Sequence, residues 1–297
     1  MRLRGELFFA GLLLAACQGP QPQLPYSATR VAGRVMARSQ ATAEKYADLI
    51  DQLTPRVRSL LPSSNDLPVD LRVVSDEERN TVKGATWRMG GGFKWIEIDS
   101  TTSSGVERFL VAHELTHFVL DETWDQLPAV MEEGLAEVVA MSVDPDSAPL
   151  RRGRHARDLG TALHTQSFES GGESRLVLTG IAVRLWDSGR IVTPPFGAFR
   201  TLPDLRAALR LGPVGFAGLD PGDSALLYAV GYLLAARIGI PGLHLLCERA
   251  AEEGLSTVPA DWIFQAARLD PDDRQAWVIA VHGWWGEAEY ARILAVE

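Results

Sequence analysis

Two histidines four positions apart, in the run His113-Glu114-Leu115-Thr116-His117, constrain this chain more than any other feature of its sequence. Val106 and Leu110 continue the same helical stripe, so the pattern predicts a helix from about residue 103 to residue 120 with both imidazoles facing inward. Residues i and i+4 of a helix share one face, and both rings can therefore bind one metal ion. Glu114 falls beside them, where it can take a proton from a water molecule on that metal.

A catalytic zinc site needs a third protein ligand. The longer histidine-type motif would place Gly at position 120 and His at position 123, but this chain has Leu120 and Thr123 there. The glutamate-type motif places the third ligand on a following helix. The pattern predicts such a helix at Ala129–Met141, and it carries two candidate ligands, Glu132 and Glu133.

Two neighbours of Glu133 favour it over Glu132. Gly134 removes a side chain beside it, which allows the two predicted helices to approach closely. Glu137 lies four residues later on the same face, where it can accept a hydrogen bond from a ligand histidine and fix the tautomer of that ring. Glu132 has an alanine at the equivalent position.

The motif HELTH, the following loop that ends in Leu127-Pro128, and the motif EEGLAE together resemble the gluzincin metallopeptidases, specifically the peptidase MA-like group. In that group the second-helix glutamate before the glycine is the third zinc ligand, and the acidic residue four positions later is an outer-shell partner. The resemblance therefore implies a Zn²⁺ cofactor with ligands His113, His117 and Glu133, general base Glu114 and outer-shell residue Glu137.

The implied reaction is hydrolysis of a peptide bond in a peptide or protein substrate. Glu114 accepts a proton from zinc-activated water and later passes it to the leaving amine. A further donor for the oxyanion is expected from the later half of the chain. The segment YAVGYLLAARIG at 228–239 is similar to a later helix of the family, which implies Tyr228, with Tyr232 as second choice; a core role for both remains the alternative.

Two further expectations concern substrate binding. By resemblance, a predicted strand at Lys94–Asp99 is the edge strand that pairs with an extended substrate. Gluzincin aminopeptidases carry an acidic signature upstream, and Arg88–Glu97 offers no convincing match, which favours an endopeptidase. The rival hypothesis is a catalytically inactive zincin-fold lipoprotein that acts as a binding or assembly module at the membrane. An intact Glu114 argues against that rival.

The first residues predict export. A basic start is followed by the apolar run Leu7–Ala16, which is too short to span a bilayer but suits a signal peptide. The run ends on LAAC at 14–17 and resembles the lipobox of bacterial lipoproteins, which implies acylation of Cys17 and a membrane anchor. Gln18 after the cysteine favours, by resemblance, the outer membrane of the cell envelope, facing the periplasm or the cell exterior. An ordinary secretory signal with an incidental cysteine is the alternative.

The order of predicted elements indicates an α+β fold. A helical pattern covers 28–61 with an interruption near Pro55, and strands are predicted at Val69–Val74 and Lys94–Asp99. We therefore expect a small mixed or antiparallel N-terminal sheet packed on the HExxH helix, followed by a mainly helical part. The expected divisions are a signal peptide at 1–16, a tether at 17–27, a zincin subdomain at 28–142 and a helical subdomain at 143–297.

The second half is less regular. Residues 143–222 show only a strand-like stretch at 176–186 and a short helical pattern at 202–211, and His155 and His164 are expected to be solvated loop residues. Beyond them the patterns predict helices at 224–238, 241–253, 260–269 and 271–281, the last with Asp270 as cap and Pro271 as first residue.

Composition excludes one class of partner. The chain has 29 Lys and Arg against 38 Asp and Glu, a net charge of −9, and no run of basic residues. Nucleic-acid binding needs clustered positive charge, so no nucleic-acid partner is expected. Of the two cysteines, Cys247 lies in an apolar helical pattern and is expected to be a buried thiol.

Overall fold

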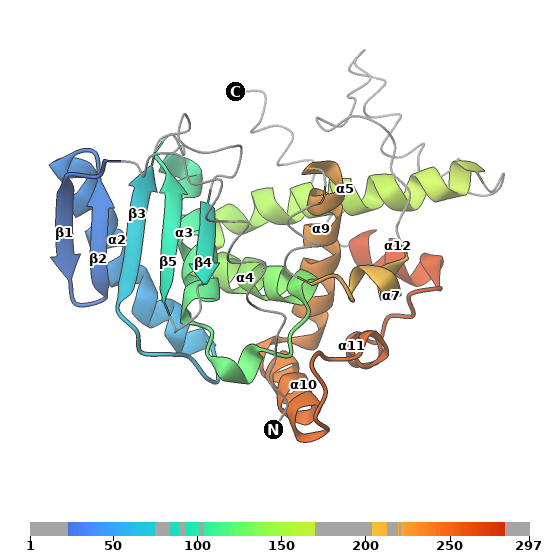
Figure 1. The fold of residues 1–297 in the computed structure, drawn as a ribbon. Helices are drawn as coiled ribbons and strands as arrows, with labels where there is room; N and C mark the ends of the chain where they lie inside the picture. Colours follow the sequence, from blue (N-terminus) through green and yellow to red (C-terminus); the bar gives the residue numbers. More distant parts are fainter. Residues whose placement is uncertain are drawn as a thin grey trace, which may run out of the picture.

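The computed structural model has an α+β fold, with a five-stranded mixed sheet on the N-terminal side and helices after it (Figure 1). It describes residues 23–74, 84–88, 93–100, 104–169, 204–212, 219 and 221–282. The predicted signal peptide, Cys17, and the strand-like stretch at 176–186 lie outside the described residues. The fold class expected from the sequence is confirmed.

The strand order is β1-β2-β3-β5-β4. The central pairs β2–β3 and β3–β5 are parallel, and the outer pairs β1–β2 and β4–β5 are antiparallel. Two of the strands coincide with the predicted ones. The strands are β1 (Tyr26–Arg30), β2 (Gly33–Ala37), β3 (Val69–Val74), β4 (Gly84–Arg88) and β5 (Lys94–Asp99).

The continuous helix predicted at 28–61 is wrong in its first part. This part forms the β1–β2 hairpin, and helix α2 (Gln40–Leu60) begins only after Ser39, whose side chain accepts a hydrogen bond from the backbone of Thr42. The alanines there are good helix formers, but pairing with β3 decides the structure. The interruption near Pro55 is also wrong, because α2 continues through it and loses at most one backbone hydrogen bond.

Strand β5 is not the edge strand that the sequence analysis expected. It lies between β3 and β4, and β4 is the outermost strand at this end of the described sheet. The side chains of β4 alternate, so that Gly84, Thr86 and Arg88 face helix α3 (Ser104–Val119), while Trp87 stacks on Trp95 of β5 on the other face. The strand nearest the predicted metal helix is thus β4.

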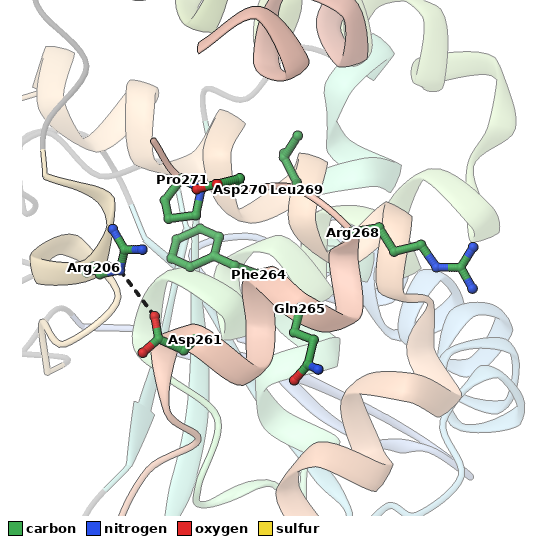
Figure 2. Close-up of a pocket in the computed structure, with 8 residues that line it drawn as sticks. All are labelled: Arg206, Asp261, Phe264, Gln265, Arg268, Leu269, Asp270 and Pro271. Atoms are coloured by element: carbon green, nitrogen blue, oxygen red, sulfur yellow. Dashed lines mark hydrogen bonds and ion pairs between the residues drawn. The ribbon is translucent and has the colours of Figure 1, made fainter. Parts of the chain in front are cut away.

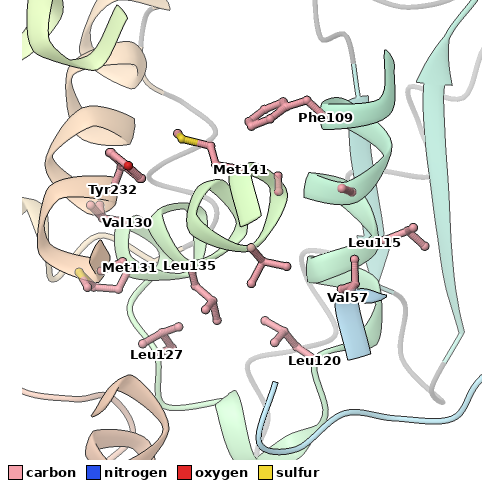
Figure 3. Packing of buried hydrophobic residues seen from close by; sticks show 14 of the residues in the cluster. Val57, Phe109, Leu115, Leu120, Leu127, Val130, Met131, Leu135, Met141 and Tyr232 are labelled. Atoms are coloured by element: carbon pink, nitrogen blue, oxygen red, sulfur yellow. The ribbon is translucent and has the colours of Figure 1, made fainter. Parts of the chain in front are cut away.

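Helices α2 and α3 cover one face of the sheet, and α4 (Ala129–Val143) packs between α3 and a later helix, α9 (Pro221–Ile238) (Figure 1). Fully buried aliphatic side chains fill the space between these layers (Figure 3). Burial of such groups is the main favourable term in folding. Those labelled in Figure 3 include Val57 from α2, Leu115 from α3, and Met131 and Leu135 from α4.

Helix α5 (Ala148–Glu169) lies in the first part of the stretch 143–222, where the sequence shows no clear helical pattern. The short helix α7 (Leu205–Ala208) lies within the predicted 202–211. The last helix of the described residues, α12, begins at Arg274 and not at Pro271, because Asp273 accepts a hydrogen bond from the backbone of Ala276 while Asp270 caps a preceding turn. The described C-terminal helices after α9 are α10 (Ile240–Glu252), α11 (Ala260–Ala267) and α12 (Arg274–His282).

No single helix in the described part of the chain has the length and hydrophobicity of a membrane span; α9 and α10 meet that test only when taken together as a pair bent by 94°.

Candidate metal centre

The three predicted ligands come together between α3 and α4. The Nε2 atoms of His113 and His117 lie 3.2 Å apart, and Oε2 of Glu133 lies 3.1 Å from the first and 3.3 Å from the second. Their donor atoms all fall within 4.8 Å of one another. The three residues therefore form a group that could hold a metal ion.

The end of α3 is anchored so that its histidine-bearing face stays in place. The side-chain amide of Asn65 donates to the carbonyls of Phe118 and Leu120 at 2.9 and 3.1 Å, and Lys94 donates to Leu120 at 2.7 Å. These bonds satisfy carbonyls that a helix end leaves without a partner. A short turn follows, in which Asp121 accepts from the Thr123 backbone, and the chain then reverses into α4.

Glu114 is buried, with an exposed fraction of 6%, on the face of α3 that meets β4. The hydroxyl of Thr86 lies 2.9 Å from its carboxylate oxygen Oε2. A Cβ atom at Gly84 would approach Oε1 to 2.8 Å, so a larger residue there would displace the carboxylate. The predicted base is therefore held at Oε2 by Thr86 and given space at Oε1 by Gly84, two alternate residues of one strand.

Glu132, the alternative ligand, is not part of the converging group. Its Oε1 accepts a hydrogen bond from Nδ1 of His117 at 2.7 Å, and its carboxylate forms an ion pair with Arg88. The two adjacent glutamates thus have different contacts. Glu133 faces the Nε2 atoms of both histidines, and Glu132 contacts Nδ1 of His117. No local pattern points to Arg88, because β4 is brought next to α4 only by the folded sheet.

Glu137 lies behind His113, as expected, but the expected hydrogen bond is not formed. Its Oε1 is 3.6 Å from Nδ1 of His113, and this buried Nδ1 has no hydrogen-bond partner among the described residues. The other oxygen accepts from Nε2 of His155 at 3.0 Å. An unpaired donor facing a carboxylate fits a site whose geometry tightens when a metal binds at Nε2.

His155 is not the solvated loop residue that the sequence suggested. It lies on α5 with an exposed fraction of 6%, between Glu137 and the ring of Tyr232, which stacks on it at 5.0 Å. A helix that packs on α9 was not expected in this stretch, so no sequence signal pointed to this role. The side chain of His164 is not among those described.

The two candidate tyrosines on α9 point to different places. The ring of Tyr228 is 6.3 Å from the ring of His113, and its hydroxyl lies in the electrostatic surroundings of Glu133. Burial raises the pKa of this hydroxyl well above its usual value, and the charges of Glu133 and Glu114 act in the same direction. Tyr228 therefore keeps its proton as a donor, whereas Tyr232 is directed to His155.

The charges of the centre shift the pKa values of its members. Burial alone would lower the pKa of His117, but the carboxylates of Glu133 and Glu132 outweigh it and raise the pKa well above its usual value. Burial alone would raise the pKa of Glu133 and Glu137, but the charges and hydrogen bonds of neighbouring histidines lower both. In the metal-free protein, these shifts favour a proton on His117 at the position where a metal ion would bind.

Gly134 acts differently from what the sequence suggested. It does not bring α4 close to α3; it faces α9, where a Cβ atom would lie 2.2 Å from the backbone of Gly231. A Cβ atom at Gly231 would in turn lie 2.1 Å from the carbonyl oxygen of Val130. This close crossing brings α9, and with it Tyr228, to the metal centre.

A separate hollow of about 350 Å³ lies between α7, α11 and the turn before α12 (Figure 2). Arg206 in its wall is already paired with Asp261 at 3.1 Å and with Asp272 at 2.8 Å. None of the residues of the metal centre lines it. His244 and Cys247 lie on α10 as packed residues; Cys247 is fully buried, as expected.

Compared with known protein families, with curated proteins and with solved structures, the chain has no significant match.

Proposed function

We propose that this protein is a zinc-dependent peptidase of the gluzincin type that cleaves within peptide or protein chains. The observation that supports it most is the convergence of His113, His117 and Glu133 with Glu114 on one side and Tyr228 on the other. Two imidazoles and one carboxylate form the donor set of many catalytic zinc sites in metalloproteases.

Zinc held by these three residues would polarise the scissile carbonyl and make water acidic enough to attack it near neutral pH. Glu114 accepts the proton of the attacking water as the new C–O bond forms, and delivers it to the amine nitrogen as the C–N bond breaks. The Tyr228 hydroxyl donates a hydrogen bond to the carbonyl oxygen as negative charge develops on it. Glu132 accepts a hydrogen bond from Nδ1 of His117 and orients that ring, and Glu137, 3.6 Å behind Nδ1 of His113, would accept from it once the site tightens around a metal.

The proposed location is the bacterial cell envelope, with the protein anchored to the outer membrane through lipid on Cys17. The support is the lipobox-like LAAC at 14–17 after an apolar run. Several acyl chains on one residue bind a membrane stably, because each buried CH₂ contributes about 0.8 kcal/mol. The peptidase would then act on proteins or peptides that reach the membrane surface.

The test is zinc content and peptide cleavage by the purified full chain and three variants. The parent is expected to hold one zinc ion and to cleave members of a mixed peptide library, while Glu133→Ala loses most of the zinc. Glu114→Gln keeps the zinc and loses cleavage, because its amide cannot accept the proton. Glu122→Ala, an exposed glutamate in the turn between α3 and α4, is the matched control and behaves as the parent.

A folded parent that takes up no zinc would overturn the proposal. A parent that binds zinc at Glu133 but cleaves no peptide would instead support the inactive binding module. Cleavage by Glu114→Gln at the parent's rate would remove Glu114 as the base.

A further inference from the structure

Arg88 connects the outermost strand near α3 to two helices at once. Its Nη2 donates to the carbonyl of His117 at 3.0 Å and pairs with Oε1 of Glu132, while Nη1 lies 3.5 Å from Oε2 of Glu132. The guanidinium thus faces both carboxylate oxygens, an arrangement that sets orientation as well as energy. The last turn of α3 and the first turn of α4 are tied together by this one side chain.

Glu132 transmits this constraint to the ring of His117. Its Oε1 accepts from Nδ1 at 2.7 Å, which keeps a proton on Nδ1 and leaves Nε2, 3.3 Å from Oε2 of Glu133, as the nitrogen that can bind a metal. The side chains of His117 and Glu132 are only 11% and 17% exposed. Because little water reaches the pair, this hydrogen bond competes with few alternatives.

We infer that Arg88 and Glu132 are positioning residues for the metal ligand His117: Arg88 holds the Glu132 carboxylate, and the carboxylate fixes the tautomer and angle of the ring. The inference rests on the proposed function, since it assumes that His117 binds a metal. It divides the motif EEG into a ligand, Glu133, and an orienting residue, Glu132. It also makes strand β4 part of the metal centre. Among the described residues, two side chains form ion pairs with Glu132: Arg88 of β4 and His117 itself.

The same strand also reaches the base. Thr86 and Arg88 are two residues apart in β4 and therefore point to the same side, one at Glu114 and the other at Glu132. The backbone of β4 is itself held by its antiparallel pairing with β5. The position of β4 consequently fixes the orientation of two side chains: that of the base Glu114, through Thr86, and that of the ligand His117, through Arg88 and Glu132.

The test measures zinc affinity of the full chain by competition with a chromogenic chelator, and the visible spectrum of the cobalt-loaded protein. Arg88→Met and Glu132→Ala are each expected to weaken zinc binding by about 10-fold to 100-fold, the usual effect of losing an outer-shell partner. Glu132→Gln, which keeps an acceptor oxygen, recovers part of the loss. The double variant is weaker than Glu132→Ala alone by less than the full effect of Arg88→Met, because the part of that effect that passes through Glu132 is already lost and only the bond to the His117 carbonyl remains to be removed.

Arg34→Met and Asp70→Ala are the matched controls, since they remove an exposed Arg–Asp pair from neighbouring strands and should leave zinc affinity and the cobalt spectrum unchanged. Parent-like affinity in both Arg88→Met and Glu132→Ala would overturn the inference while leaving the peptidase proposal intact. A loss in Glu132→Ala as large as that in Glu133→Ala, with a cobalt spectrum showing a lost ligand, would overturn it by making Glu132 a ligand. Failure of the parent to bind zinc would overturn both proposals and is recognised from the parent alone.

Discussion

The hydroxyl of Thr86 lies 2.9 Å from both the backbone carbonyl and the Oε2 atom of Glu114. One hydroxyl proton therefore serves two acceptors on the same residue, one that fixes the helix and one that fixes the carboxylate. At the other oxygen, the absence of a side chain at Gly84 leaves just enough space. The proposed base thus has its position set by a strand and not by its own helix.

Replacing Thr86 by valine removes this hydroxyl and keeps the shape of the side chain. We expect kcat to fall by about 10-fold to 100-fold, because a misplaced catalytic group can cost about 100-fold in rate. Zinc content should not change, since Thr86 touches no proposed ligand. Steady-state kinetics and metal analysis check this, with Thr86→Ser, which keeps the hydroxyl, as control. Full activity in Thr86→Val would show that Glu114 needs no support from β4.

Tyr228→Phe removes the proposed oxyanion donor. Loss of one such donor lowers kcat by about 100-fold to 1,000-fold, and we expect that range here with the zinc content unchanged. Tyr232→Phe keeps its stacking on His155 and should lose far less. Kinetics on the same peptide distinguish the two variants. The reverse order of effects would assign the role to Tyr232.

Zinc binding should release a proton from His117. Its pKa in the metal-free protein is raised by Glu133 and Glu132, so the ring carries a proton at about pH 7 that a metal must displace. The affinity for zinc is therefore expected to fall by about 10-fold for each pH unit below the raised pKa. Calorimetry in buffers of different ionisation enthalpy counts the protons released. A count near zero would mean that His117 is already neutral.

Gly134→Ala should destabilise the fold, although alanine is the better helix former by about 1 kcal/mol. The new Cβ atom would lie 2.2 Å from the backbone of Gly231, and α9 must move away to admit it. Overpacking of this kind costs about 1–3 kcal/mol, which exceeds the gain in helix propensity. Urea unfolding gives the change in the free energy of unfolding.

Gly212→Ala is the control for this measurement. Gly212 is exposed and nothing lies within 4 Å of a Cβ atom placed there, so its effect should stay within about 0.5 kcal/mol. A Gly134→Ala variant as stable as the parent would contradict the close crossing of α4 and α9.

Cys17→Ser tests the lipid anchor. Without the thiol no acyl chain can be attached, and the protein should leave the membrane fraction of expressing cells. Fractionation with detection of an epitope tag, and incorporation of labelled palmitate, measure this. A serine variant that stays in the membrane fraction would contradict the lipobox interpretation.

Elements with a clear apolar period were predicted better than elements without one. The strands β3 and β5 and the helices α3 and α4 agree with the sequence analysis, because their apolar residues repeat at the strand or helix period. Strand β4 has five residues, begins with glycine, and shows no apolar alternation. The first half of helix α5 is rich in arginine, and the helix also contains two glycines, Gly153 and Gly160. Their structure depends on β5 and α9, the elements against which they pack.

Within the metal centre, the sequence alone determines the pair His113 and His117, because the helical period places i and i+4 on one face. It also limits the third ligand to the run at 132–133. The sequence favours Glu133 of the two through its neighbour Glu137, and the packing of α4 then sets which one faces the rings, since adjacent helix residues point about 100° apart. The partners Arg88 and His155 come from elements far apart in sequence, and no local pattern encodes which distant side chain a folded sheet or helix crossing brings to the site.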